Sequence, residues 1–187
     1  MDLLTALDRG FTEFGQRVEY IGDDQWSADT PCAEWTVRDL VNHLIGEHLW
    51  APCLLKGSSV AEVGDRFHGD VGGDDPRGAW EAASAVSQPA FHRPGALDLR
   101  VDTTMGPLDA EEYGWQMTID LTVHAWDLAR GIGVVDRLDP ELAAALLERV
   151  APHAEEWQGH GIFAPPVKVP ADAPAQDQLV ALLGRKP

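Results

Sequence analysis

An aspartate and a histidine, Asp120 and His124, stand four residues apart near the middle of the sequence. The stretch GWQMTIDLTVHAWDLARG, residues 114–131, has no glycine or proline between its ends and predicts one buried helix. Four-residue spacing puts both side chains on one helical face. The flanking positions carry Tyr113, Met117, Leu121 and Leu128. Ionisable groups in an apolar stripe need partners. That partner is a metal ion, or the two groups satisfy each other and the backbone; this helix alone leaves both interpretations open.

A second helix, predicted over residues 36–55, carries two histidines. His43 lies at the edge of its apolar stripe and can turn toward a neighbouring helix, whereas His48 lies nearer the middle of the stripe. Glu47 shares the face of His43, where it either orients that imidazole or lies on the rim as a solvated charge. Spacing therefore leaves His43 and His48 as competing candidates for a site.

His43, Asp120 and His124 together supply two imidazoles and one carboxylate from two helices. Three protein ligands leave an open position on a zinc-like ion, as in catalytic zinc sites. The same donors suit ferrous iron, so spacing does not choose the metal. Asp127 can hold the free ring nitrogen of a ligating histidine. Alternatively, Asp127 pairs with Arg130 one turn further on.

Other chemistries find little support in the sequence. The serines lack a G-x-S-x-G setting, and no P-loop or dinucleotide-binding glycine pattern occurs. The cysteines, Cys32 and Cys53, form no C-x-x-C pair. Cys32 precedes a helix start, where the dipole can lower a thiol pKa, but a buried and unreactive thiol is the preferred interpretation. The four other histidines are expected to be solvated: His68, His92, His153 and His160.

The elements that must position these residues are helices. Long helices are predicted over residues 3–20, 36–55, 114–131 and 139 to about 157, the last perturbed or split by Pro152. This order indicates an all-α helical bundle with long irregular connections. The connections are a loop over 57–77, a short helix over 76–86 and an irregular or edge-strand-like segment over 88–107. A last short helix is expected over 176–183.

Size and charge bound the function. A chain of 187 residues with 44% hydrophobic residues and seven Trp fits one folded domain. A net charge of −17 argues against nucleic-acid and anionic-membrane partners. No apolar run approaches the roughly 20 residues that span a bilayer, and no signal peptide is visible. We therefore expect a cytoplasmic protein.

Three segments carry a resemblance to a known family: TPCAEWTVRDLVNHLIGEHLWA, IDLTVHAWDLARGIG and DQLVALLGRKP. Together they resemble the actinobacterial metal-binding proteins related to mycothiol-dependent maleylpyruvate isomerase, within the DinB-like superfamily of four-helix bundles. The resemblance covers most of the chain. It implies one DinB-like domain over residues 1–187, with about 158–187 as an extended tail that ends in a short helix.

The family resemblance also implies a ligand set. In these proteins one histidine of the second helix and an acid-x3-His pair bind a divalent metal, usually zinc. The matching residues are His43, Asp120 and His124, which selects His43 over His48. Iron, nickel and manganese remain alternatives to zinc. The family acid is commonly glutamate, and the shorter Asp120 ligates either directly or through water.

A reaction follows from the same resemblance. Mycothiol, as cosubstrate, is expected to bind the metal as its thiolate and to attack a small electrophile, which makes the protein a thiol transferase. The isomerase itself has a separate C-terminal domain, whereas about 30 residues follow Trp157, so isomerisation of maleylpyruvate is not expected. The alternatives are a non-catalytic metal-binding or ligand-binding module and a metal-dependent hydrolase. A homodimer is one option for assembly.

Overall fold

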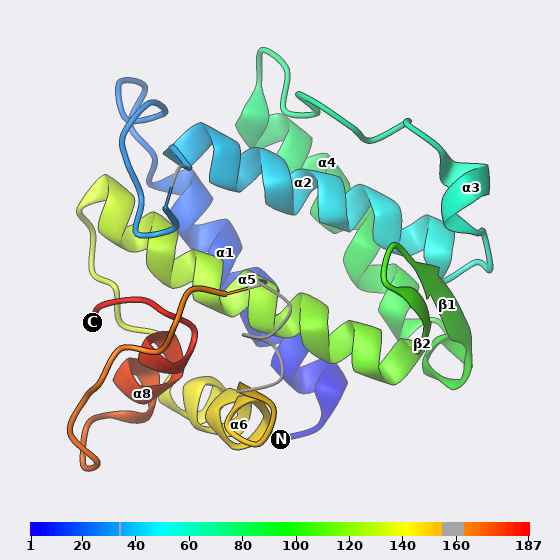
Figure 1. The fold of residues 1–187 in the computed structure, drawn as a ribbon. Coiled ribbons are helices and arrows are strands. Elements are labelled where there is room, and N and C mark those ends of the chain that lie inside the picture. Colours follow the sequence, from blue (N-terminus) through cyan, green and yellow to red (C-terminus); the bar gives the residue numbers. More distant parts are fainter. Residues whose placement is uncertain (34, 155–162) are drawn as a thin grey trace.

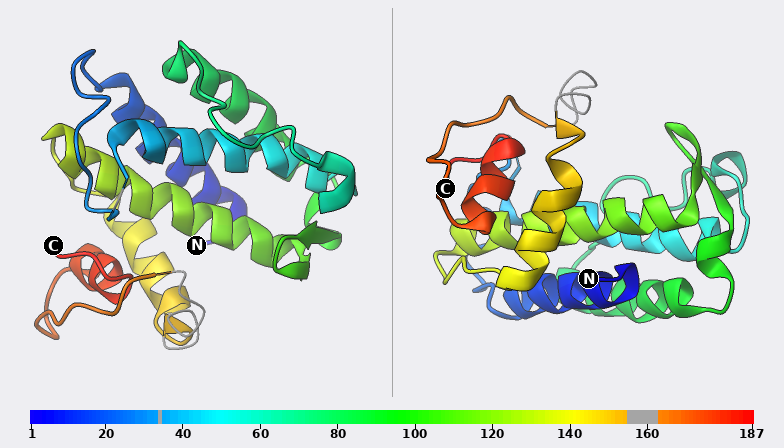
Figure 2. Two further views of the ribbon diagram at one scale, coloured as in Figure 1. Left: turned by 45° about the horizontal axis from the view of Figure 1, so that its top comes forward. Right: turned by 90° about the horizontal axis from the view of Figure 1, so that it is seen from below.

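Four long helices of the described chain form a bundle (Figure 1). The computed structural model describes residues 1–33, 35–154 and 163–187. The bundle helices are α1 (Leu3–Glu19), α2 (Val37–Leu54), α4 (Pro76–His92) and α5 (Ala110–Ile132). Figure 2 shows two layers, α2 beside α5 and α1 beside α4; α1 packs across on α5, and α2 on α4. The all-α four-helix bundle predicted from the sequence is confirmed, but its fourth helix is α4 and not the helix predicted over 139 to about 157, which is α6.

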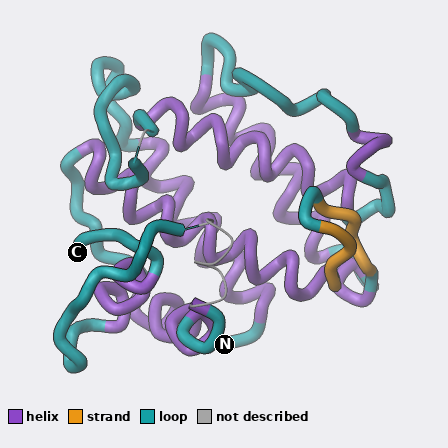
Figure 3. The backbone as a smooth tube through the Cα atoms, viewed as in Figure 1, coloured by secondary structure: helices purple, strands orange, loops and turns teal. Residues whose placement is uncertain are grey.

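Shorter elements surround the bundle. They are α3 (Val60–Val63), the 3-10 helix η1 (Ala96–Asp98), β1 (Arg100–Thr103), β2 (Gly106–Asp109), α6 (Pro140–Val150) and α8 (Ala175–Leu182). The strands form an antiparallel hairpin that pairs Arg100 with Asp109 and Thr103 with Gly106. Figure 3 shows this hairpin at the end of the bundle where α5 begins. Among the described helices, none has the length and apolar content needed to cross a bilayer.

Capping residues fix where the helices begin and end. The predicted capping box of α2 is present: the Thr36 side chain accepts from the Asp39 backbone N–H, and the Asp39 side chain accepts from the Thr36 backbone N–H. Pro140 occupies the first turn of α6, as predicted, and Asp139 caps that helix. Helix α5 ends at Gly133, whose φ of 72° is left-handed. These local signals set the registers of the site-bearing helices.

Helix α5 lies between two hydrophobic cores. One side packs into the bundle core, where Leu121 of α5 lies with residues such as Leu44 of α2. Its other side packs with α6 and α8 in a second core that includes Ile119, Leu146 and Leu179. A helix that is buried on two sides has little solvent to hydrate its ionisable groups. Polar side chains at its centre must therefore find partners inside the protein.

The helix predicted over 76–86 is longer in the structure, where it reaches His92. Pro89 lies inside α4, where a proline removes a backbone hydrogen bond. The buried face nevertheless continues past Pro89, since Ser87 and Phe91 are buried. Burying a Phe side chain contributes about 1.5–3 kcal/mol, which offsets much of the roughly 3 kcal/mol cost of an internal proline.

Two predicted connections contain regular structure. The loop predicted over 57–77 includes α3, whose start is fixed by a capping box between Ser59 and Glu62. The irregular segment predicted over 88–107 contains η1, β1 and the start of β2. Helix α6 ends at Val150, two residues before Pro152, and the rest of that predicted helix up to Trp157 reaches beyond the described residues. The short last helix is present as α8.

Candidate metal site

The three predicted metal ligands lie together between α2 and α5. Nε2 of His43 is 3.0 Å from Oδ2 of Asp120, and Nε2 of His124 is 3.2 Å from Oδ1 of Asp120. One ligand atom from each residue lies within 4.8 Å of the other two. The fold therefore brings the predicted side chains together, and their role as metal ligands stays a prediction.

The donor set fits a divalent ion. Tetrahedral ligands about 2.1 Å from an ion lie roughly 3.4 Å from one another, close to the 3.0 and 3.2 Å separations of this cluster. Both imidazoles turn Nε2 toward the same carboxylate, so in their neutral forms they present lone pairs to a shared point. Two nitrogens and a carboxylate are ligands that zinc and related ions accept.

Charge within the cluster is strongly coupled. Burial disfavours the charge of Asp120, but His43 and His124 outweigh burial and hold the pKa of Asp120 well below its usual value. Burial also opposes a charge on His124, yet the carboxylate of Asp120 raises the pKa of His124 to about 9. The pKa of His43 is raised too, because Asp120 outweighs burial. Without a metal, protons take the place that a cation can fill.

Asp127 holds the other ring nitrogen of His124. Its Oδ2 is 3.0 Å from Nδ1 of His124, and Arg185 donates to the same oxygen at 2.8 Å. Asp127 is fully buried and Arg185 is nearly so. With Nδ1–H donated to Asp127, His124 is the tautomer that leaves Nε2 free to face Asp120. The residue proposed to orient a ligating histidine is placed to do so.

The alternative pairing of Asp127 with Arg130 is wrong. Arg130 pairs instead with Asp136, at 3.0 Å on the surface. The partner of Asp127 is Arg185, which lies 58 positions further along the chain. It follows α8, and its guanidinium lies 5.7 Å from the centre of the Phe163 ring. No spacing rule within one helix could have indicated this partner, because tertiary packing of the C-terminal segment brings it to α5.

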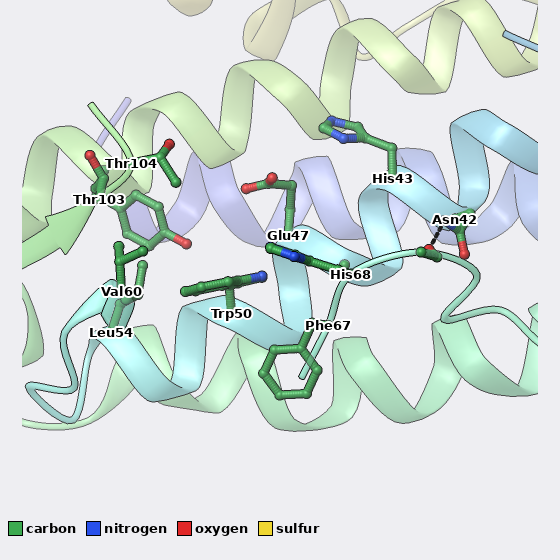
Figure 4. Close-up of a pocket in the computed structure, with 13 residues that line it drawn as sticks. Asn42, His43, Glu47, Trp50, Leu54, Val60, Phe67, His68, Thr103 and Thr104 are labelled. Atoms are coloured by element: carbon green, nitrogen blue, oxygen red, sulfur yellow. Dashed lines mark hydrogen bonds between the residues drawn. The ribbon is translucent and has the colours of Figure 1, made fainter. Parts of the chain in front are cut away.

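The role of Glu47 in orienting His43 stays a prediction. In the described part of the chain, no hydrogen bond joins these two side chains; Figure 4 shows both projecting from α2 toward α5. Burial, with a smaller contribution from Asp120, raises the pKa of the Glu47 carboxyl group. The side chain lies in the wall of a cavity.

His48 lies away from the cluster. Its Nδ1 is 2.8 Å from Oγ of Ser87 on α4, and its ring packs against Phe11 and Trp80. Burial lowers the pKa of His48 to about 3, so the ring stays neutral. The geometry therefore separates the two candidates that helical spacing left open, and it brings only His43 toward Asp120.

Cys32 lies on the far side of His124. A ligand atom from each of Cys32, His124 and Asp127 falls within 4.8 Å of the other two. Burial raises the pKa of the Cys32 thiol, so the dipole-activated thiol considered from the sequence is not supported and the unreactive thiol is favoured.

The Trp35 ring packs against the rings of both histidines of the cluster. Its centroid lies 4.7 Å from that of His43 and 5.6 Å from that of His124.

Two of the cavities that reach the cluster share part of their walls. The first, of about 330 Å³, is bounded by α2, the loop after α3 and the hairpin (Figure 4). The second, of about 310 Å³, is bounded by α2, α5 and Phe163, and Asp120 lies in its wall. His43, Glu47 and Tyr113 belong to both walls. A small molecule in either cavity would contact the cluster directly.

Known proteins share the sequence pattern and the fold of this chain. Residues 7–129, which include all three predicted ligands, match the model of the mycothiol maleylpyruvate isomerase N-terminal domain. The chain is 34% identical over 194 aligned positions to uncharacterized proteins from two strains of Mycobacterium tuberculosis. These alignments cover 99% of this chain and 98% of each relative.

Solved structures share the fold. A crystal structure of mycothiol-dependent maleylpyruvate isomerase superimposes with a TM-score of 0.62, and a mutant of that enzyme with 0.65, both at 18% identity. Each match covers 88% of this chain and 72% of the other chain. The helical-bundle fold predicted from the sequence is therefore shared with these structures.

Proposed function

Because the chain belongs to the mycothiol maleylpyruvate isomerase N-terminal-domain family, as its sequence predicted, we propose that it is a metal-dependent thiol transferase. His43, Asp120 and His124 hold a divalent ion, for which zinc is preferred over iron, nickel or manganese. The observation that carries this proposal is the convergence of two imidazoles and one carboxylate beside a cavity.

Each residue of the site has a separate role in the proposed reaction. His43, Asp120 and His124 would hold the ion, which would lower the pKa of a coordinated thiol and so supply a nucleophile at neutral pH. Asp127 and Arg185 fix the ring of His124 through its Nδ1–H. Asp120 would neutralise part of the cation's charge; without an ion, its two oxygens face Nε2 of His43 and Nε2 of His124.

The partial exposure of the cluster supports a catalytic ion rather than a purely structural one. The side chains of His43 and Asp120 are 28% and 26% exposed, whereas that of His124 is 6% exposed. Structural zinc sites usually close their fourth position with a protein ligand. Here the adjoining cavities leave room for a thiol and a small electrophile. The solved relatives are named for mycothiol dependence, and we take mycothiol as the cosubstrate.

The proposal is tested by conjugate formation. Zinc-loaded protein is incubated with mycothiol and a panel of uncharged and charged electrophiles, with and without chelator. We expect thiol- and metal-dependent conjugation, reduced about a hundredfold or more in His124→Ala. His92→Ala is the matched control, because His92 pairs with Asp8 on the surface.

The alternatives give different results in the same assay. Turnover that needs the metal but no thiol would indicate a hydrolase that uses bound water. Stoichiometric metal with rates equal to the uncatalysed reaction across the panel would indicate a binding module and would contradict the transferase.

A further inference from the structure

One face of α2 carries a carboxylate among side chains that wall a cavity. His43, Glu47, Trp50 and Leu54 recur at helical spacing and therefore lie on one face. All four line the cavity of about 330 Å³ bounded by α2, the loop after α3 and the hairpin (Figure 4). Burial is the main cause of the raised pKa of Glu47, and no hydrogen bond to another described residue offsets it. Buried carboxylates are normally paired, so Glu47 lacks a counter-charge.

A second polar group in the same wall lacks a partner. Tyr113 is 5% exposed, and its hydroxyl has no hydrogen-bond partner within the described part of the chain. Its ring stacks on Phe91, with centroids 5.9 Å apart, which limits how far the hydroxyl can move. Buried polar groups are nearly always hydrogen-bonded. A carboxylate and a phenol oxygen can both accept hydrogen bonds, so the cavity suits a ligand that donates them.

The chain itself offers no cation for this wall. None of the described residues that line the cavity is Lys or Arg. The His68 side chain, which does line it, is 62% exposed, and its Nδ1 lies 3.1 Å from Oδ1 of Asp65. Arg66 packs over an aromatic ring next to the cavity but donates to two backbone carbonyls. A ligand can therefore supply the positive charge that Glu47 lacks.

The cluster reaches this cavity at one end, through His43. A divalent ion there would carry two positive charges, which Asp120 and a bound thiolate would offset, so that end accepts an anion. His43 and Trp50 lie on opposite sides of Glu47 along α2. A cation between Glu47 and Trp50 is thus nearer to the carboxylate than to the cluster, and Coulomb attraction grows as the distance falls. The two ends of the cavity therefore differ in the charge that they favour.

Trp50 adds an aromatic face to the same end. Its ring packs against Phe67 and His68, with centroids 6.2 and 6.1 Å apart. Figure 4 shows Glu47 and Trp50 projecting from α2 toward the same space. The face of a tryptophan ring attracts cations more strongly than that of any other side chain. The wall thus combines a carboxylate, a phenol oxygen and an indole, all of which favour a positively charged ligand.

We propose that this cavity binds a primary ammonium group, which donates to the Glu47 carboxylate and to the Tyr113 oxygen and packs against the Trp50 ring. The inference rests on the proposed thiol transfer for the reaction and adds the substrate class, an electrophile that bears an amine. An ammonium group has three N–H donors and no acceptor, which matches a wall of two unpaired acceptors. Charge-assisted hydrogen bonds are also stronger than neutral ones.

Two molecules of the same shape test the inference. 2-Phenylethylamine is a cation at pH 7, and 2-phenylethanol replaces its ammonium group with a hydroxyl. Each is titrated by calorimetry into zinc-loaded protein without thiol. We expect saturable binding of the amine, at least tenfold tighter than that of the alcohol. Glu47→Gln keeps the shape of the side chain but removes its charge, and it should bring the two affinities within about twofold of each other.

Two matched variants control for changes elsewhere. Glu81→Gln removes one negative charge from an exposed position of α4 and should keep the preference for the amine. Tyr113→Phe keeps the ring on Phe91 and should weaken amine binding about threefold to tenfold. Tyr20→Phe, at a residue that is 68% exposed, should leave it unchanged.

Three outcomes would overturn the inference. The first is no saturable amine binding, and the second is equal affinity for amine and alcohol in the unmodified protein. The third is a preference for the amine that survives Glu47→Gln, because the nitrogen would then be held by the zinc ion or by another group.

The binding assay contains no thiol, so its result is separate from that of the proposed function. Selective amine binding without conjugation of any thiol would remove the transferase and keep the ammonium site. Thiol conjugation in a protein that binds amine and alcohol equally would do the reverse.

Discussion

Helix α2 carries two histidines whose surroundings shift the pKa of the ring in opposite directions. His43 faces α5, and the carboxylate of Asp120 raises its pKa despite burial. His48 faces α4, where Ser87 is a neutral partner and burial lowers its pKa to about 3. Nε2 of His48 lacks a partner among the described residues.

The difference shows what decides the charge of a buried histidine. Burial alone keeps an imidazole neutral and confined to packing, as for His48. A carboxylate within hydrogen-bond distance keeps the ring available to a proton or a metal. At His124 a second carboxylate fixes the tautomer, and Arg185 in turn fixes that carboxylate. Each of these supports can be removed separately.

The largest expected effect comes from Arg185→Met. The change leaves the fully buried carboxylate of Asp127 without its guanidinium. Breaking a buried ion pair from one side costs about 3–5 kcal/mol, and we expect about 3 kcal/mol because His124 still contacts Asp127. Urea unfolding measures the loss. Arg130→Met is the matched control, since its surface pair with Asp136 is worth about 0–1 kcal/mol. Equal losses in the two variants would refute the supporting role of Arg185.

A smaller effect should arise from His48 in acid. Its folded pKa of about 3 lies below the unfolded value of 6.5. Stability from the neutral ring is therefore complete above pH 6.5 and declines as the pH falls toward 3. At pH 5 the loss is about 2 kcal/mol. His48→Gln should lack this part of the pH dependence in unfolding experiments, whereas His68→Gln, at an exposed loop position, should keep it. Identical slopes for His48→Gln and the unmodified protein would count against the neutral buried ring.

The contribution of the cluster of His43, Asp120 and His124 to stability should depend on pH in the opposite direction. The pKa of His124 is raised to about 9, above its unfolded value of 6.5. The ion pair stabilises the metal-free protein below pH 6.5, and this contribution is lost as the pH rises through 9. Zinc must displace a proton, so its affinity should rise about tenfold per pH unit between pH 6.5 and 9. Calorimetry in two buffers at pH 7.5 should detect release of at least one proton, and zero release would contradict the coupling.

The sequence predicts the local part of this structure well. Helical spacing places Asp120, His124 and Asp127 on one side of α5, and the Thr36 cap fixes the register of α2. The prediction fails where distant contacts decide the outcome. Buried Phe91 extends α4 through Pro89, against the local propensity of proline.

The site follows the same division between local and distant contacts. Spacing identified an acid and a histidine but left His43 and His48 open, because the choice depends on which helix each ring faces. Arg185 carried no local signal, since it reaches Asp127 only after α6 and α8 have packed on α5.

Metal content tests the central claim most directly. Protein purified without chelator is analysed by elemental mass spectrometry as the unmodified chain, His43→Gln and His48→Gln. We predict about one divalent ion per chain in the unmodified protein and in His48→Gln, and less than about a tenth of an ion in His43→Gln. Equal metal content in the two variants, or substoichiometric metal in all three proteins, would contradict a metal site built on His43, Asp120 and His124.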